Sequence, residues 1–269
     1  MKYYVVSDVH GFYTPLRRAL AEKGFFDGAE PKKLIVCGDL FDRGREAVEL
    51  QAFMMELLRK DELIYILGNH EDLMPRMLHD IVSRNVFPMD LAMGSSYHTR
   101  NGTWSTALQL SGFDEAYAVD HPFELVTGVK NSDFYSVLLR HAIDYYETDR
   151  YVFVHGYLPC TQRTGFPSGY TYDPNWRAAS VYEWERARWY NGMDMAWKYG
   201  IREPNKTVVC GHWHASYGHF KIDGKGDGEF GPRSIHTPYS REGLLAIDAC
   251  TAYSGQINCV VLDDERTEK

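Results

Sequence analysis

The stretch KLIVCGDLFDRG, residues 33–44, joins an apolar run directly to a polar loop. Residues 34–37 are apolar, which predicts a buried strand over 33–37. The loop that follows holds Asp39, Asp42 and Arg43 between glycines, and residues 45–60 continue with the apolar spacing of a helix. In open α/β sheets, ligands bind beyond the carboxyl ends of the strands. This stretch therefore predicts an α/β fold with a ligand site at the end of the strand.

The same alternation of strand and helix surrounds this stretch. Residues 2–7 predict a strand, and Thr14 with Pro15 reads as an N-cap followed by the first helical position. A third strand is predicted at 63–67, with a helix from about residue 71. Further strands are predicted at 151–154, 207–210, 244–247 and 257–262, and an amphipathic helix at 176–190. Such alternation is typical of βαβ packing.

Two segments depart from this alternation. Residues 85–150 are expected to form a helical or irregular insertion, with helices near 103–111 and 132–147. Residues 215–242 are expected to form a loop insertion. We find no internal repeat and no long linker, so we expect one domain over residues 1–269. Both insertions are expected to shape the cleft beside the motifs.

Five short polar motifs each follow a predicted strand. They are DVHG at 8–11, GDLFDRG at 38–44, GNHE at 68–71, HG at 155–156 and GHWH at 211–214. Because the carboxyl ends of the strands face one crevice, we expect the five motifs to converge on one site. Their Asp, His and Asn side chains suit divalent metals such as Mn, Fe, Zn or Ni. The motifs hold enough ligands for two ions, with Asp39 placed to bridge them.

The five motifs, in this order, resemble those of the calcineurin-like metallophosphoesterase superfamily. The GDLFDRG and GNHE forms are similar to its phosphoprotein phosphatase branch, which includes bacterial Ser/Thr phosphatases and symmetrical diadenosine tetraphosphatases. The resemblance implies an α/β fold with a two-layer β-sandwich core flanked by helices. It also implies two divalent metal ions as cofactors. Manganese is the preferred identity, and Fe, Zn and Ni are the alternatives.

The resemblance also assigns roles to individual side chains. It implies that the first ion is held by Asp8, His10 and Asp39, and the second by Asp39, Asn69, His155 and His212. It also implies that His70 is the general acid, oriented by Asp42, and that Arg43 binds the phosphoryl group. Arg186 is a candidate second phosphate ligand, in competition with Arg188. The second histidine of GHWH, His214, departs from the phosphoprotein phosphatase pattern and is a candidate ligand of the first ion.

Other interpretations of these residues stay open. Arg43 could instead pair with Asp42 or Glu46, and Glu71 is interpreted as a helix-start carboxylate rather than a metal ligand. The aromatic residues between 170 and 197 are interpreted first as core packing, with stacking on a base as the alternative.

The function expected from these features is hydrolysis of a phosphomonoester, such as phosphoserine or phosphothreonine in a protein, by in-line attack of a metal-bridging hydroxide. The alternatives are a dinucleoside polyphosphate hydrolase and a phosphodiesterase. A non-catalytic scaffold that binds proteins is the alternative from another class.

Composition limits the partners. The chain has 29 Lys and Arg against 37 Asp and Glu, a net charge of −8, so we do not expect it to bind nucleic acid. No apolar run approaches the length of a membrane span, and MKYYVVSDVHG leaves no room for the core of a signal peptide. We therefore expect a chain that starts at Met1 and stays in the cytoplasm. The sequence leaves the oligomeric state open.

Overall fold

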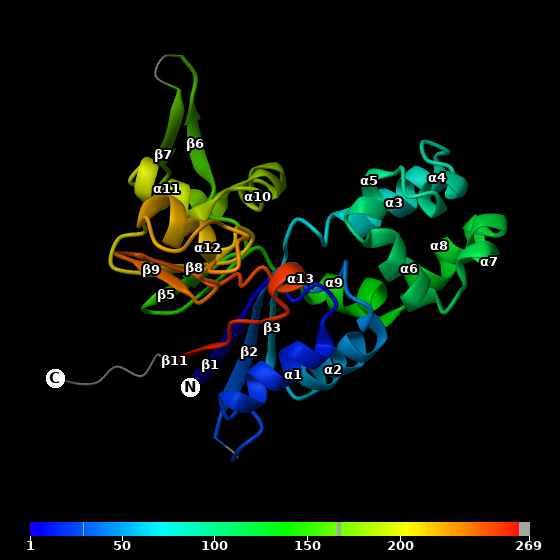
Figure 1. Cartoon of the computed structure of the whole chain (residues 1–269), viewed down its shortest axis with the longest axis horizontal. Helices are drawn as coiled ribbons and strands as arrows, with labels where there is room; N and C mark the ends of the chain where they lie inside the picture. Colours follow the sequence, from blue (N-terminus) through cyan, green and yellow to red (C-terminus); the bar gives the residue numbers. More distant parts are fainter. Residues whose placement is uncertain (29, 166–167, 264–269) are drawn as a thin grey trace.

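The strands form two main sheets in the computed structural model, which describes residues 1–28, 30–165 and 168–263 (Figure 1). The order of the first sheet is β11 (Val260–Asp263), β1 (Lys2–Val6), β2 (Lys32–Cys37) and β3 (Leu63–Ile66). The order of the second is β4 (Tyr146–Glu147), β5 (Tyr151–Phe153), β8 (Thr207–Cys210), β10 (Leu244–Ala246) and β9 (Tyr239–Arg241). A separate hairpin pairs β6 (Cys160–Arg163) with β7 (Gly169–Tyr172) and projects beyond the second sheet.

The inner strands of each sheet run parallel. β1, β2 and β3 are parallel neighbours, as are β5, β8 and β10. The antiparallel strands β11, β4 and β9 lie at the sheet edges. Loops that follow parallel strands all leave the sheet at the carboxyl ends of those strands, so this topology brings the polar motifs together.

Alternating residues of β1 show how the layers stack. Tyr3 and Val5 pack in one cluster with Phe153 and Val209 of the second sheet. Their neighbour Tyr4 belongs to a different cluster, built with helices on the outer face. Successive side chains of a strand point to opposite faces, so the first sheet is covered on both sides. The α/β fold with two β layers flanked by helices is confirmed.

The helices cover the outer faces of the two sheets. α1 (Tyr13–Glu22) and α2 (Ala47–Arg59) pack on the first sheet, and α10 (Val181–Ala187) and α11 (Gly192–Lys198) pack on the second. Shorter helical segments are η2 (Trp176–Ala178), α12 (Ala215–Tyr217), η3 (Gly218–Ile222) and α13 (Thr251–Ser254). The loop insertion expected over 215–242 contains α12, η3 and β9 as short elements. Among the described residues, no helix has the length and apolar character needed to cross a bilayer.

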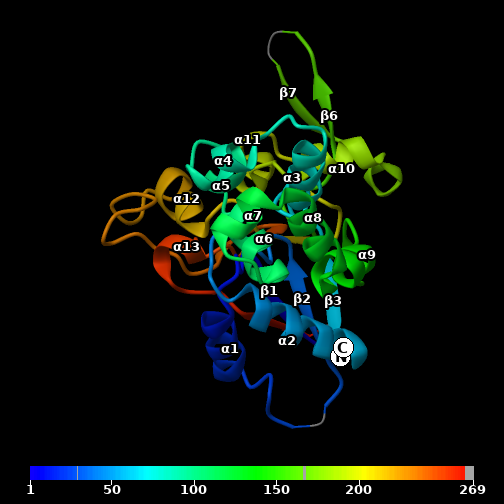
Figure 2. The same cartoon turned by 90° about the vertical axis from the view of Figure 1, so that its right-hand side faces the viewer.

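The insertion between β3 and β5 is mainly helical. It holds α3 (Leu73–Val82), α4 (Pro88–Ala92), α5 (Tyr97–Arg100), α6 (Thr103–Ser111), α7 (Glu115–Asp120), α8 (Pro122–Asn131), the π-helical turn η1 (Phe134–Leu138) and α9 (Leu139–His141). Figures 1 and 2 show α3 to α8 gathered into one lobe. α6 packs against α2, α3 and α8, and so links this lobe to the first sheet. The helix expected at 103–111 is confirmed.

The prediction of a helix over 132–147 is wrong for the residues after His141. The helical segment ends at His141, and β4 follows. The backbone N–H of Ile143 donates to the carbonyl of Tyr65, and the N–H of Leu67 donates to the carbonyl of Ile143, each at 2.9 Å. Pairing with the end of β3 replaces the local helical hydrogen bonds, an effect that the sequence pattern alone does not contain.

The helix expected at 176–190 is interrupted. η2 ends at Ala178 and α10 begins at Val181. The hydroxyl of Ser180 accepts from the backbone N–H of Glu183, whose carboxylate accepts from the N–H of Ser180. This reciprocal capping starts a new helix in the middle of the apolar pattern.

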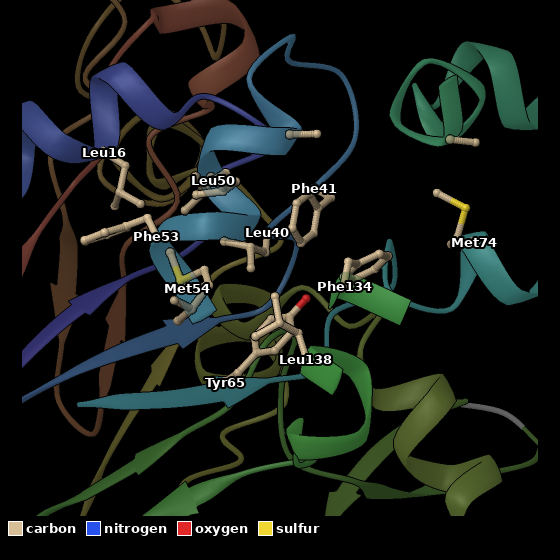
Figure 3. Close-up of a cluster of buried hydrophobic side chains, with 14 of the residues drawn as sticks. Leu16, Leu40, Phe41, Leu50, Phe53, Met54, Tyr65, Met74, Phe134 and Leu138 are labelled. Atoms are coloured by element: carbon tan, nitrogen blue, oxygen red, sulfur yellow. The ribbon is translucent and has the colours of Figure 1, made fainter. Parts of the chain in front are cut away.

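Phe134 anchors the insertion to the first sheet. Its side chain is 1% exposed and its ring centroid lies 4.4 Å from that of Phe41, in the loop after β2. Figure 3 shows both rings beside Leu40, Tyr65 and Leu138 in the same cluster. The core of the insertion is therefore continuous with the core beneath the polar loop.

We expect Phe134→Ala to lower the free energy of unfolding by about 3–5 kcal/mol, because it leaves a cavity in a close-packed cluster. The control is Phe123→Ala on α8, where the side chain is 57% exposed. We expect that control to stay within about 0.5 kcal/mol of wild type. Urea denaturation followed by circular dichroism measures both, and equal midpoints for the two variants would contradict this assignment.

Candidate active site

The loops after the parallel strands supply the site residues. They are Asp8 and His10 after β1, Asp39, Asp42 and Arg43 after β2, Asn69 and His70 after β3, His155 after β5, and His212 and His214 after β8. Six of these ten have a positive φ between 51° and 74°: Asp8, His10, Asp39, Asp42, Arg43 and His212. Residues other than glycine adopt this conformation at a cost of about 1–3 kcal/mol each, and such strain collects at functional sites.

Asp39 lies at the centre of the cluster and is only 2% exposed. Its Oδ2 is 3.8 Å from His10 Nε2 and 3.9 Å from His70 Nε2. Its Oδ1 is 3.3 Å from His155 Nε2. Two groups of side chains able to hold a metal ion share Asp39: His10 with His70, and His155 with His212. The expected bridging position of Asp39 fits this arrangement.

The donor atoms around His155 fit a metal ion. Its Nδ1–H donates to the carbonyl of Cys37 at 2.9 Å, so Nε2 turns its lone pair into the cluster. Nε2 lies 2.9 Å from Asn69 Oδ1 and 3.3 Å from Asp39 Oδ1. The Nδ1 of His10 makes the same kind of contact with a backbone carbonyl. Electron-pair donors that converge in this way suit a borderline divalent ion.

The charges of the cluster also suit a metal. Burial raises the pKa of Asp39, but the neighbouring imidazoles, that of His155 first, outweigh burial and hold this pKa below its ordinary value. Burial lowers the pKa of His212 to about 3, and burial also lowers the pKa of His10. At neutral pH the carboxylate is therefore ionised and these imidazoles are neutral, the forms that coordinate metals.

His70 is held from one side by a carboxylate and faced from the other by a guanidinium. Its Nδ1 lies 2.9 Å from Asp42 Oδ2, and its Nε2 lies 3.1 Å from Nη2 of Arg43. Nη1 of Arg43 is 2.8 Å from His10 Nε2. Burial lowers the pKa of His70, but the carboxylates of Asp39 and Asp42 outweigh burial and raise it. The Nε2 of His70 therefore faces the cluster in a geometry suited to proton transfer.

Glu71 fixes the backbone of two site loops. Its carboxylate accepts from the backbone N–H groups of Asp39 and Leu40 at 2.9 Å and of Gly68 at 2.7 Å, and from the hydroxyl of Tyr65 at 2.7 Å. The side chain is buried. The interpretation of Glu71 as a helix-start carboxylate missed these contacts, because no local pattern predicts which backbone a buried carboxylate will meet.

Residues of four of the five motifs line one cavity of about 300 Å³, whereas His155 of the HG motif is not among its lining residues. Sequence reasoning assigned no role to Asp248, which lines it and is 4% exposed, although Asp248 follows β10 as the other site residues follow their strands. Burial raises the pKa of this carboxyl to about 7. The lining residues are Asp8, His10, Asp39, Arg43, Asn69, His70, Asn101, Trp189, His212, Trp213, His214, Phe230, Asp248, Cys250 and Thr251.

Asp8 and His214 line this cavity but lie in neither of the two groups around Asp39. Oδ2 of Asp8 accepts from the backbone N–H of His212 at 2.9 Å. Nε2 of His214 lies 3.2 Å from Oε2 of Glu229. Their assignment as ligands of the first ion stays a prediction.

Neither Arg186, on α10, nor Arg188, which follows the end of that helix, lines the cavity. Nη2 of Arg186 donates to Gln162 Oε1 at 2.7 Å. Its competitor Arg188 pairs with the carboxylates of Asp72 and Asp144. The geometry therefore lends no support to Arg186 as a phosphate ligand, because its guanidinium is directed to the β6–β7 hairpin.

Candidate metal ligands that follow parallel strands and meet at the carboxyl ends of those strands are the arrangement expected of a ligand site in an α/β fold. The family model of calcineurin-like phosphoesterases matches residues 1–229. The chain therefore belongs to the calcineurin-like phosphoesterases. Members of this family depend on a site that holds two metal ions, and the cluster of candidate ligands around Asp39 agrees with this.

Curated relatives match parts of the chain. The asymmetrical bis(5'-nucleosyl)-tetraphosphatase PrpE of Bacillus velezensis is 25% identical over 144 residues, which are 51% of this chain and 52% of that protein. The symmetrical bis(5'-nucleosyl)-tetraphosphatase of Thioalkalivibrio sulfidiphilus is 39% identical over 71 residues, 26% of this chain and 25% of that protein. The chain thus spans about half or less of the length of these relatives.

A solved structure supports the fold. The cold-active protein-tyrosine phosphatase of a psychrophilic Shewanella aligns with 98% of this chain and 75% of its own, with a TM-score of 0.50 and 14% identity.

We expect Glu71→Gln to lower the free energy of unfolding by about 1–3 kcal/mol, since an amide cannot accept all four hydrogen bonds of the carboxylate. The two site loops should loosen, so metal content after dialysis should fall as well. The control is Glu49→Gln, an exposed carboxylate on α2. Urea denaturation and elemental analysis measure the two effects, and a Glu71→Gln protein that matches the control in both would refute the role of Glu71.

Proposed function

We propose that this phosphoesterase hydrolyses dinucleoside polyphosphates. The observation that carries the proposal is an aromatic wall in the same cavity as Arg43 and His70. Trp189 is 44% exposed there, and Trp213 and Phe230 line the cavity beside it. An exposed indole offers a face for stacking a base, while the polar side of the cavity suits the phosphate chain.

The names of the relatives support the same substrate class. Both curated proteins described above are bis(5'-nucleosyl)-tetraphosphatases. Trp189 also belongs to the aromatic segment for which base stacking was the alternative interpretation. Hydrolysis of a small phosphomonoester requires the polar side of the cavity alone, so the aromatic wall favours a substrate with a base.

The residues proposed to hold the two ions are those implied by the motifs. Asp8, His10 and Asp39 would hold one, and Asp39, Asn69, His155 and His212 the other, with His214 as a further candidate. The donor set suits manganese and equally Fe, Zn or Ni. When bound, the ions would neutralise charge on phosphate oxygens and acidify the attacking water.

The protein's own side chains would complete the reaction. Arg43, within hydrogen-bond reach of both His10 and His70, would bind two phosphoryl oxygens with its planar guanidinium. As water forms its bond to phosphorus and the bond to the leaving oxygen breaks, the water would lose a proton to the solvent and His70 Nε2 would give the leaving oxygen one. Asp42 would hold Nδ1–H and thereby keep Nε2 directed at the leaving group.

A second candidate is phosphomonoester hydrolysis, including that of phosphoserine or phosphothreonine. The volume of about 300 Å³ favours it, because this lies at the small end of ligand cavities and suits one phosphoryl group with a short substituent.

We expect Asp39→Asn to lose bound metal and activity together, because it removes the shared carboxylate charge. His70→Asn should keep its metal while kcat falls by about 100-fold or more, the usual contribution of general acid catalysis. Elemental analysis and hydrolysis of diadenosine tetraphosphate, phosphopeptide, p-nitrophenyl phosphate and bis-p-nitrophenyl phosphate test both. Full activity of Asp39→Asn would overturn the proposal.

We expect Trp189→Ala to raise KM for diadenosine tetraphosphate by about 10-fold, the effect of losing one stacked base. The KM for phosphoserine, which has no ring, should not change. Trp197→Ala is the matched control, because Trp197 is 50% exposed on α11 and does not line the cavity. Unchanged KM values for both substrates would favour the second candidate.

A further inference from the structure

One face of α6 in the helical insertion contacts the loop that holds Asp42. The hydroxyl of Thr103 donates to Asp42 Oδ2 at 2.8 Å. The backbone N–H of Asp42 donates to the hydroxyl of Thr106 at 3.1 Å. Both threonines have 0% exposure. α6 therefore holds the carboxylate of Asp42 through one side chain and its backbone through another.

The same face of α6 holds the far end of this loop. Gln109 accepts from the backbone N–H of Ala47 at 3.0 Å and donates to the carbonyl of Gly44 at 3.1 Å. Thr103, Thr106 and Gln109 are spaced by three residues, which places them along one face of a helix. The contact between α6 and the loop is thus a line of directed hydrogen bonds.

The backbone at the start of α6 also lies against the loop. Gly102 is the N-cap and has a φ of 88°. A Cβ at this position would lie 2.1 Å from the backbone nitrogen of Arg43. Only glycine combines this conformation with so close an approach.

We infer that Thr103 is a positioning residue for proton transfer by His70. Oδ2 of Asp42 is shared between the hydroxyl of Thr103 and Nδ1 of His70, at 2.8 Å and 2.9 Å. The terminal torsion of an aspartate side chain is broad, so the carboxylate of Asp42 needs external contacts to keep one orientation. The Thr103 hydroxyl supplies that contact and so fixes the side of the imidazole that faces the leaving group. This inference rests on the proposed role of His70 as proton donor.

The alternative is that Thr103 only packs α6 onto the loop. A packing role would affect stability and would act regardless of what stands at position 70. A positioning role acts through His70 and depends on the hydroxyl, so it disappears when His70 is replaced and returns with serine. These differences separate the two roles.

The test compares Thr103→Val, Thr103→Ser and the control Thr99→Val, whose hydroxyl donates to the carbonyl of Leu91 elsewhere in the insertion. The substrates are diadenosine tetraphosphate and p-nitrophenyl phosphate. We expect Thr103→Val to lower kcat by about 10-fold, the effect of losing one hydrogen bond to a charged group, with KM unchanged. Thr103→Ser and Thr99→Val should retain wild-type kcat.

The same substitution in a His70→Asn background should have no further effect on kcat. An equal loss in both backgrounds, or wild-type kcat in Thr103→Val, would overturn the inference. If His70→Asn alone keeps wild-type activity, the proposed function of His70 fails instead.

Long-range ¹H–¹⁵N NMR supplies a readout that needs no turnover. We expect the proton of neutral His70 on Nδ1 in wild type and in Thr103→Ser, and a mixture of tautomers in Thr103→Val. An unchanged tautomer in Thr103→Val would refute the positioning role.

Discussion

The buried carboxylate of Asp39 is the constraint on which the rest of the site depends. An ionised group with 2% exposure is stable only when other groups compensate its charge and satisfy its oxygens. The backbone N–H of His70 donates to its Oδ1 at 2.9 Å, and a divalent ion held between this carboxylate and the imidazoles around it would compensate the charge. Its own backbone N–H is held by Glu71. Two sheets must therefore bring their strand ends together around a single side chain.

This crowding explains why glycines flank the site. A Cβ on Gly68 would lie 2.2 Å from Asp39 Oδ1, and one on Gly211 would lie 2.2 Å from Asp8 Oδ2. Side chains at these positions would separate the loops, and the donor atoms would no longer converge. The close packing of backbone at the strand ends is thus part of how the cluster is built.

The sequence predicted the fold class, the central strands and the convergence of the five motifs, because each of these follows from residues that are close together in the chain. It failed where distant contacts decide. The chain after His141 pairs with β3 instead of continuing as a helix. The contact of Arg186 with Gln162 is likewise one that no local pattern indicates. The contacts of Glu71 and Thr103 were missed for the same reason, since both meet backbone or side chains from other loops. The helix that carries Thr103 was predicted, but its neighbours were not.

The pairing of β1 with β11 has a consequence for biosynthesis. Lys2 lies opposite Asp263, so β1 leaves the ribosome long before β11, the strand that covers its outer edge. Until then β1 presents unpaired N–H and C=O groups beside an apolar surface, the kind of edge that captures other strands. Chaperone binding to the nascent chain would protect this edge, and a stalled ribosome would leave it open.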